Sequence, residues 1–152
     1  MLKLTKKADY GLMAMKHLAE NGAQGSLSAK DVAEAYGIPS EALAKILQRL
    51  AKAGLLQSQH GINGGYTLAR DAKEISAFEV IRAIDGPLFI TSCITVRGEC
   101  GQTDRCTVRE PLRRVNQSIE EVLRQIKISD MKEKEEVLES GEKKPIDLVS
   151  IR

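Results

Sequence analysis

Two short helical patterns joined by a glycine-containing turn constrain the fold of this chain more than any other feature. Ser28 begins the first pattern with a capping box, because Asp31 follows three residues later, and Gly37 ends it. Ile38-Pro39 forms the turn, and Ser40 is expected to cap the second helix. The residues expected to face inward are Val32, Ala33, Tyr36, Leu43, Ile46, Leu47, Leu50 and Ala53. The pattern predicts a helix-turn-helix.

A hairpin with a glycine-rich tip follows the second helix. Residues 55–59 and 66–69 are short strand candidates, and the connection between them is His60-Gly61-Ile62-Asn63-Gly64-Gly65. Glycines without a side chain let the backbone of such a tip approach another surface closely. We therefore expect a two-stranded wing beside the helix-turn-helix.

Three further helices are expected around this unit. The first covers residues 5–20, and another opens with the capping box Ser76-Ala77-Phe78-Glu79 and stops at Gly86-Pro87. Pro111 suits the first turn of a third, whose apolar residues are Leu112, Val115, Ile119, Val122 and Ile126. Their spacing of three and four favours pairing with a second copy, because the preceding elements already fill a small domain; packing on the chain's own wing domain is the alternative.

These patterns predict a mostly α fold, a winged helix-turn-helix with a two-stranded wing and a long C-terminal dimerisation helix. The winged-helix DNA-binding domain should cover residues 1–87, a cysteine-bearing loop residues 88–109, and the dimerisation helix residues 110–130. Residues 131–152 are rich in lysine and glutamate and are expected to form a flexible tail.

The composition is that of a cytoplasmic globular protein. The chain lacks a run of about 18 apolar residues and an apolar leader with a cleavage site. Its net charge is only +2, but lysine and arginine outnumber aspartate and glutamate within residues 1–70. The basic excess therefore lies in the half that carries the helix-turn-helix, which favours a nucleic-acid partner.

The second helix of the motif carries side chains suited to base edges. Lys45, Gln48 and Arg49 lie on its polar face, and Lys and Arg bond guanine whereas Gln bonds adenine. Lysines before this helix, such as Lys3 and Lys7, suit phosphates instead. Any one of these residues alone is consistent with a solvated surface, but their combination with the wing favours DNA. The candidate DNA-binding residues are Lys6, Lys30, Ser40, Lys45, Gln48, Arg49, His60, Asn63 and Gly64.

Three cysteines follow the winged-helix pattern at the spacing Cys93-x6-Cys100-x5-Cys106. An odd number of cysteines without an export signal indicates metal or redox chemistry rather than a disulfide framework. Thiolates are the ligands preferred by iron-sulfur clusters and zinc, although the paired Cys-x2-Cys typical of zinc is missing. The spacing alone leaves both open, together with an incidental occurrence.

The motifs together resemble the bacterial iron-sulfur winged-helix transcription regulators of the IscR and NsrR type, over residues 1 to about 131. The matching segments are Leu4-Thr5-Lys6, Asp9-Tyr10-Gly11, Gly64-Gly65-Tyr66-Thr67-Leu68, residues 75–87 and the three cysteines. Ala83-Ile84-Asp85-Gly86-Pro87 and Cys106-Thr107-Val108-Arg109 look closest to the regulator of the SUF cluster-assembly system. The resemblance implies a homodimer that binds operator DNA and responds to an iron-sulfur cluster, of 2Fe-2S or 4Fe-4S type, held by Cys93, Cys100 and Cys106.

The chain departs from the family's pattern at three positions. Arg109 stands where the IscR type has a histidine as fourth ligand, whereas Asp9 matches an aspartate that nitric-oxide-sensing relatives supply from the other subunit. Asp9 is thus a candidate ligand, and the alternative is a carboxylate favoured by the helix dipole. His60 replaces an arginine of the wing and Ala44 a glutamate of the recognition helix, which puts the operator sequence in doubt.

We expect a transcription regulator that acts as a repressor, and not an enzyme. A paired acid–base constellation and a phosphate-binding glycine motif are both missing from the sequence. The signal could be cluster supply, nitric oxide, iron or redox state. The alternatives are a winged-helix regulator that senses oxidants through thiols or binds zinc without a cluster, and an electron-transfer or enzymatic iron-sulfur protein.

Overall fold

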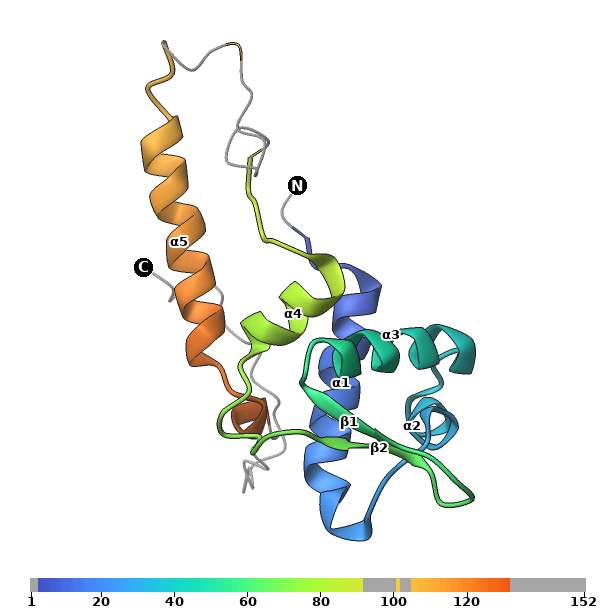
Figure 1. Cartoon of the computed structure of the whole chain (residues 1–152). Helices are drawn as coiled ribbons and strands as arrows, with labels where there is room; N and C mark the ends of the chain where they lie inside the picture. Colours follow the sequence, from blue (N-terminus) through green and yellow to red (C-terminus); the bar gives the residue numbers. More distant parts are fainter. Residues whose placement is uncertain (1–2, 92–100, 102–104, 132–152) are drawn as a thin grey trace, which may run out of the picture.

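The computed structural model describes residues 3–91, 101 and 105–131 and has the expected mostly helical winged-helix fold. Its elements are α1 (Lys6–Asn21), η1 (Gly22–Gln24), α2 (Ala29–Tyr36), α3 (Ser40–Lys52), β1 (Leu56–Gln59), β2 (Gly65–Leu68), α4 (Ala77–Asp85), α5 (Arg109–Gln125) and η3 (Ile128–Met131). Figure 1 shows α1, α2, α3 and the hairpin on one side of α4, and α5 on the other.

The two helices of the motif begin and end much as their sequences predict. The Ser28 hydroxyl accepts a hydrogen bond from the Asp31 amide at 3.1 Å, and the Asp31 carboxylate accepts one from the Ser28 amide at 2.9 Å. Gly37 closes α2 in the left-handed conformation, with φ 64°. The prediction that Ser40 caps α3 is wrong: Pro39 occupies the N-cap position, and Ser40 is the first helical residue. The fixed φ of proline suits this boundary.

Tyr36 and Ala53 were predicted to face inward, and the structure shows that they do not. Tyr36 is 37% exposed, and its hydroxyl lies 3.2 Å from His17 Nδ1. Ala53 is exposed because α3 ends at Lys52. The inward positions between them are buried as expected, and the largest fully buried side chains of the core are Met15, Leu43, Leu47, Leu50, Ile75, Ile81, Ile128, Val32 and Val80.

The wing is an antiparallel hairpin in which Leu56 pairs with Leu68 and Gln59 with Gly65. Its β2 strand also bridges to Leu27, the residue before the Ser28 cap, through two backbone bonds between Leu27 and Tyr66 at 3.2 and 2.8 Å. Gly65 lies so close to the Leu27 carbonyl that a Cβ atom would overlap it. A glycine at this position therefore allows the wing to dock against the start of the helix-turn-helix.

The C-terminal helix is shorter than predicted, because α5 ends at Gln125 and Ile126 already has an extended backbone. The chain then returns to the core: the Ile128 amide donates to the Ile75 carbonyl at 2.9 Å, and Ile128 is 1% exposed. The apolar stripe of α5 stays largely open, with Val115 48% and Val122 56% exposed. Within the described ranges, no helix has the length and apolar character needed to cross a bilayer.

The capping box predicted at the start of α4 is confirmed, with Ser76 buried and Glu79 half-exposed. The Ser76 hydroxyl accepts from the Glu79 amide at 3.2 Å, and the Glu79 carboxylate accepts from the Ser76 amide at 2.9 Å and from Arg70 at 2.7 Å. Burial raises the pKa of Glu79, but these bonds from Ser76 and Arg70 outweigh it and hold the pKa below its ordinary value. The cap thus holds a charged carboxylate at the positive end of α4.

We predict that Ser76→Ala lowers the free energy of unfolding by about 1 kcal/mol, because the α4 N-terminus loses its cap. Urea unfolding at neutral pH measures the change. Ser118→Ala is the matched control, since the exposed Ser118 hydroxyl bonds the Arg114 carbonyl within α5 at 2.9 Å. Its removal should cost less than about 0.5 kcal/mol, and an equal loss in both variants would contradict the prediction.

Candidate nucleic-acid interface and cysteine segment

The outer face of α3 is polar and basic, as predicted. Its side chains are exposed because Leu43, Ile46, Leu47 and Leu50 bury the opposite face of the helix. The exposed residues are Glu41, Lys45, Gln48, Arg49 and Lys52. A helix anchored on one face and polar on the other can enter a major groove without disturbing the core.

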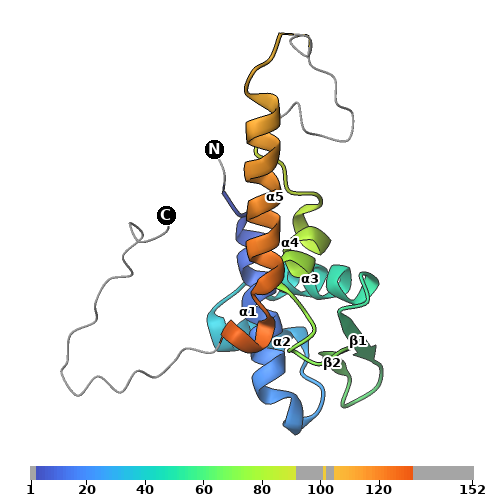
Figure 2. The same cartoon turned by 90° about the vertical axis from the view of Figure 1, so that its left-hand side faces the viewer.

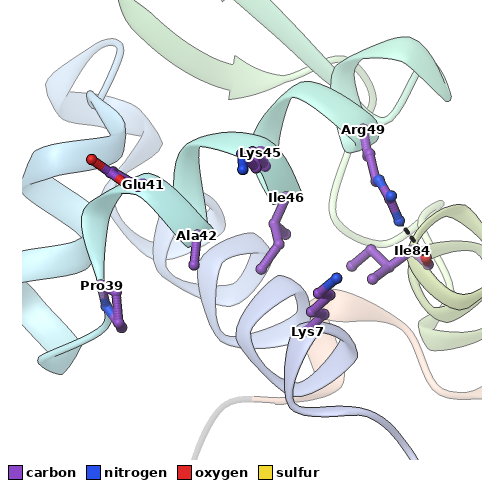
Figure 3. A pocket seen from close by; sticks show the side chains of 8 residues that line it. All are labelled: Lys7, Pro39, Glu41, Ala42, Lys45, Ile46, Arg49 and Ile84. Carbon is purple, nitrogen blue, oxygen red and sulfur yellow. Dashed lines mark hydrogen bonds between the residues drawn. The ribbon is translucent and has the colours of Figure 1, made fainter.

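A groove of about 360 Å³ runs beside α3, between the first turn of α1 and the end of α4. Its floor is apolar, with Ile46 and Ile84, and its rim carries the cations Lys7, Lys45 and Arg49 (Figure 3). The structure thus places Lys7 of α1 beside the recognition helix. The sequence identified Lys7 only as one of several lysines suited to phosphates, since its closeness to α3 depends on helix packing.

Arg49 is already engaged within the protein. Its Nη1 donates a hydrogen bond to the Ile84 carbonyl at 3.0 Å, from α3 to the end of α4 (Figure 3). The guanidinium carries further N–H groups that this bond does not use. The sequence assigned Arg49 to base contacts alone, because a partner on another helix leaves no sign in local spacing.

The other candidate DNA-binding residues of the helices are solvent-accessible. Lys6 lies 5.9 Å from the centre of the Tyr10 ring, in the first turn of α1. Lys30 forms an ion pair with Glu34 at 3.8 Å, with side chains 78% and 69% exposed, so water screens the attraction strongly. Ser40 is exposed at the start of α3. These groups remain available to phosphate.

The wing tip has a fixed backbone and one exposed apolar side chain. The Ser26 hydroxyl donates to the Asn63 carbonyl at 2.7 Å, which ties the tip to the segment before α2. A Cβ on Gly64 would lie 2.6 Å from the Gln59 carbonyl oxygen, so the turn requires glycine. His60 is exposed, and Ile62, which the sequence analysis did not select, is fully exposed between His60 and Asn63.

Only part of the cysteine site can be described. Cys93 and Cys100 lie outside the described residues, whereas Cys106 is half-buried three residues before α5. Asp9 is exposed in the first turn of α1, and Arg109 is the first residue of α5. Among the described residues, no three histidine, cysteine or carboxylate side chains come together as metal ligands. Three thiols with a carboxylate remain a donor set that fits an iron-sulfur cluster.

Asp9 lies in the first turn of α1, whereas Cys106 lies three residues before α5. Figures 1 and 2 both show that the beginning of α5 extends beyond the winged-helix core, away from the body of α1. The structure therefore does not bring the beginning of α5, which follows Cys106, next to the body of α1.

Comparison with known proteins places these features in a family. Residues 4–134 match the family described as Rrf2, iron-dependent transcriptional regulator. The HTH-type transcriptional regulator IscR of Vibrio campbellii is 33% identical over 97% of this chain and 87% of its own length. The regulator of the same name from Xenorhabdus nematophila is 33% identical over 96% of this chain and 88% of its own length.

Solved structures show the same fold. IscR of T. potens superposes with a TM-score of 0.64 and 33% identity, over 86% of this chain and 85% of that one. CymR, described as the global cysteine regulator of B. subtilis, has a TM-score of 0.69 and 28% identity, over 86% of this chain and 95% of that one. These relatives are named as regulators and not as enzymes, and the chain belongs to the Rrf2 family of transcriptional regulators.

Proposed function

We propose that the protein is a homodimeric DNA-binding repressor whose affinity is set by an iron-sulfur cluster and which acts on genes of SUF cluster assembly. The observation that carries the DNA-binding part is the exposed basic face of α3 beside a glycine-tipped wing. The cluster part rests on the three cysteines and on the likeness to regulators named IscR. Binding to chromosomal operators requires a cytoplasmic location.

Each subunit would place α3 in a major groove. Lys45 and Gln48 would contact base edges, with Arg49 beside them. Lys6, Lys7, Lys30 and Ser40 would bond phosphates and fix the position of the helix on the duplex. At the wing, His60, Asn63 and Gly64 would approach a minor groove.

The open face of α5 would bind the same face of a second copy. It forms an apolar groove of about 450 Å³. Its lining includes Val115, Ile119, Val122 and Leu123. A symmetric pair of such faces removes apolar surface from water on both chains and sets the two α3 helices at a fixed separation, as two operator half-sites require.

Cys93, Cys100 and Cys106 would hold the cluster, and Asp9 of the partner subunit would supply the fourth ligand. Bonds from these thiolates and the partner's carboxylate to the metal would tie the 88–109 segment to the partner's first helix. Arg109 excludes the histidine ligation of the IscR type at that position. A cluster-free regulator based on thiol oxidation is the second candidate, because solved relatives include an oxidized form of Staphylococcus aureus CymR.

We predict that Lys45→Ala weakens binding to a duplex from the chain's own promoter by roughly 10- to 100-fold, the effect of losing one good base contact. Fluorescence anisotropy at fixed salt measures the dissociation constant. Lys127→Ala is the matched control, because Lys127 lies between α5 and η3 and its ammonium bonds the Arg124 carbonyl. If both substitutions weaken binding equally, the assignment of α3 to the groove is wrong.

We predict that Val122→Glu converts the dimer to a monomer, because it places a charge on each of two buried copies of the same face. Sedimentation equilibrium measures the mass. Gln117→Glu adds the same charge at another exposed position of α5 and should leave the dimer intact. A monomeric wild-type protein, or a dimeric Val122→Glu variant, would refute the proposed interface.

We predict that anaerobically purified protein is brown and contains iron and sulfide, and that replacing Cys93, Cys100 and Cys106 by alanine removes the colour and changes promoter affinity. Visible absorption and metal analysis check the first part, and anisotropy the second. Asp9→Ala should make the colour labile, whereas Asp130→Ala should not, because Asp130 lies in η3. A colourless wild-type protein whose binding changes on oxidation would instead support the thiol-based regulator.

A further inference from the structure

The last residues of α4 join the two helices nearest the DNA-binding face. Ile84 offers its carbonyl to Arg49 of α3 at 3.0 Å. The final carbonyls of a helix have no partner within it, and a cation at this end is favoured by the helix dipole. Arg49 therefore caps the C-terminus of α4 from the neighbouring recognition helix (Figure 3).

The next residue, Asp85, is hydrogen-bonded to Thr5 at the start of α1. The Asp85 carboxylate accepts hydrogen bonds from the Thr5 hydroxyl at 2.6 Å and from the Thr5 amide at 3.4 Å. The same Thr5 hydroxyl caps α1 by accepting from the Ala8 amide at 3.1 Å. The helices α1 and α4 also pack closely, because a side chain at Gly11 of α1 would overlap the Ile84 side chain. Two consecutive residues of α4 thus fix α3 and the start of α1.

Residues 86–90 follow α4, and the far end of this segment is hydrogen-bonded to α5. The Ile90 amide donates to Asn116 Oδ1 at 3.0 Å, and Asn116 is 4% exposed, the one buried residue of α5. Asn116 also donates to Glu120 at 3.1 Å, which holds its amide in place. Residues 86–90 therefore run from α3 and α1 to the C-terminal helix, and in the sequence they lead directly into the stretch that begins before Cys93.

We propose that Arg49 is a positioning residue for DNA binding, which joins the recognition helix to residues 84–90 so that DNA on α3 and the state of this segment influence each other. The proposal rests on the proposed function in one respect, namely that α3 contacts DNA. The N–H groups of Arg49 that do not reach Ile84 can bond a phosphate or base, so one guanidinium spans both partners. Coupling between two such sites is reciprocal: if the segment alters DNA affinity, DNA must alter the segment.

Lys45 provides a matched comparison. It lines the same groove, one helical turn before Arg49. Its ammonium makes no hydrogen bond or ion pair among the described residues, so it can serve DNA without holding α4. If both residues only contacted DNA, replacing either one would have the same effect on residues 84–90. If Arg49 connects α3 to α4, only its replacement should alter how residues 84–90 respond to DNA.

The experiment measures amide hydrogen exchange, by mass spectrometry, of peptides covering residues 84–90 in the full-length protein, with and without a saturating duplex from its own promoter. In the wild type we expect DNA to slow this exchange about fivefold or more, the lower end of the coupling typical of linked sites. Lys45→Ala should show the same slowing once enough DNA is added to saturate it. Arg49→Lys keeps the charge but replaces the planar fork by a single ammonium, and it should lose the slowing at saturation. Arg49→Gln is a second variant, and thermal unfolding confirms that each is folded.

The outcomes distinguish failure of the inferred coupling through Arg49 from failure of the proposed DNA binding. If the complex forms but exchange of residues 84–90 is unchanged in the wild type, or is slowed equally in Arg49→Lys, Arg49 is a DNA contact only and the inference is overturned. If the wild type binds no duplex even at low salt, the proposed function itself fails. Slowing in the wild type and in Lys45→Ala, together with its loss in both Arg49 variants, supports the coupling.

Discussion

The packing of α4 across α1 and α3 is the contact on which the rest of the structure depends. Val80 and Ile84 bury the face of α4 that joins the core, and the capping box of Ser76 and Glu79 fixes where the helix begins. The other end of α4 receives Arg49 and Thr5. Figure 1 shows α5 on the far side of α4 from α3, so α4 lies between the proposed dimer surface and the proposed DNA surface.

This arrangement gives the fold two faces with different physical demands. The α3 face is charged and solvated, as the proposed DNA contact requires, whereas the open face of α5 is apolar, as the proposed subunit contact requires. Asn116 is a buried polar residue of α5, and its side-chain oxygen accepts the hydrogen bond of the part-buried Ile90 amide. An apolar side chain at this position could not accept that bond. Local polar contacts of this kind connect residues 84–90 to α3 and to α5.

The elements could be predicted from the sequence where local chemistry determines them. Ser28, Gly37 and Ser76 mark helix ends because caps act over three or four residues, and the glycines of the wing mark a turn. Ser40 failed as a cap because Pro39 took that position. The bond from Arg49 to Ile84 spans 35 residues, and the return of Ile128 to the core depends on how α1 and Ile75 pack, so neither leaves a local pattern. For the proposed cysteine site, the sequence names three candidate thiol donors, of which only Cys106 lies among the described residues.

A hydroxyl-radical footprint on the chain's own promoter, obtained anaerobically beside a random duplex, tests the central claim most directly. The account predicts two symmetric protected stretches whose centres lie about one helical turn or a small multiple of it apart, as expected when a dimer sets two α3 helices in successive major grooves. It also predicts that the random duplex remains unprotected at the same protein concentration. A single protected stretch, or equal protection of random DNA, would contradict the dimeric winged-helix regulator.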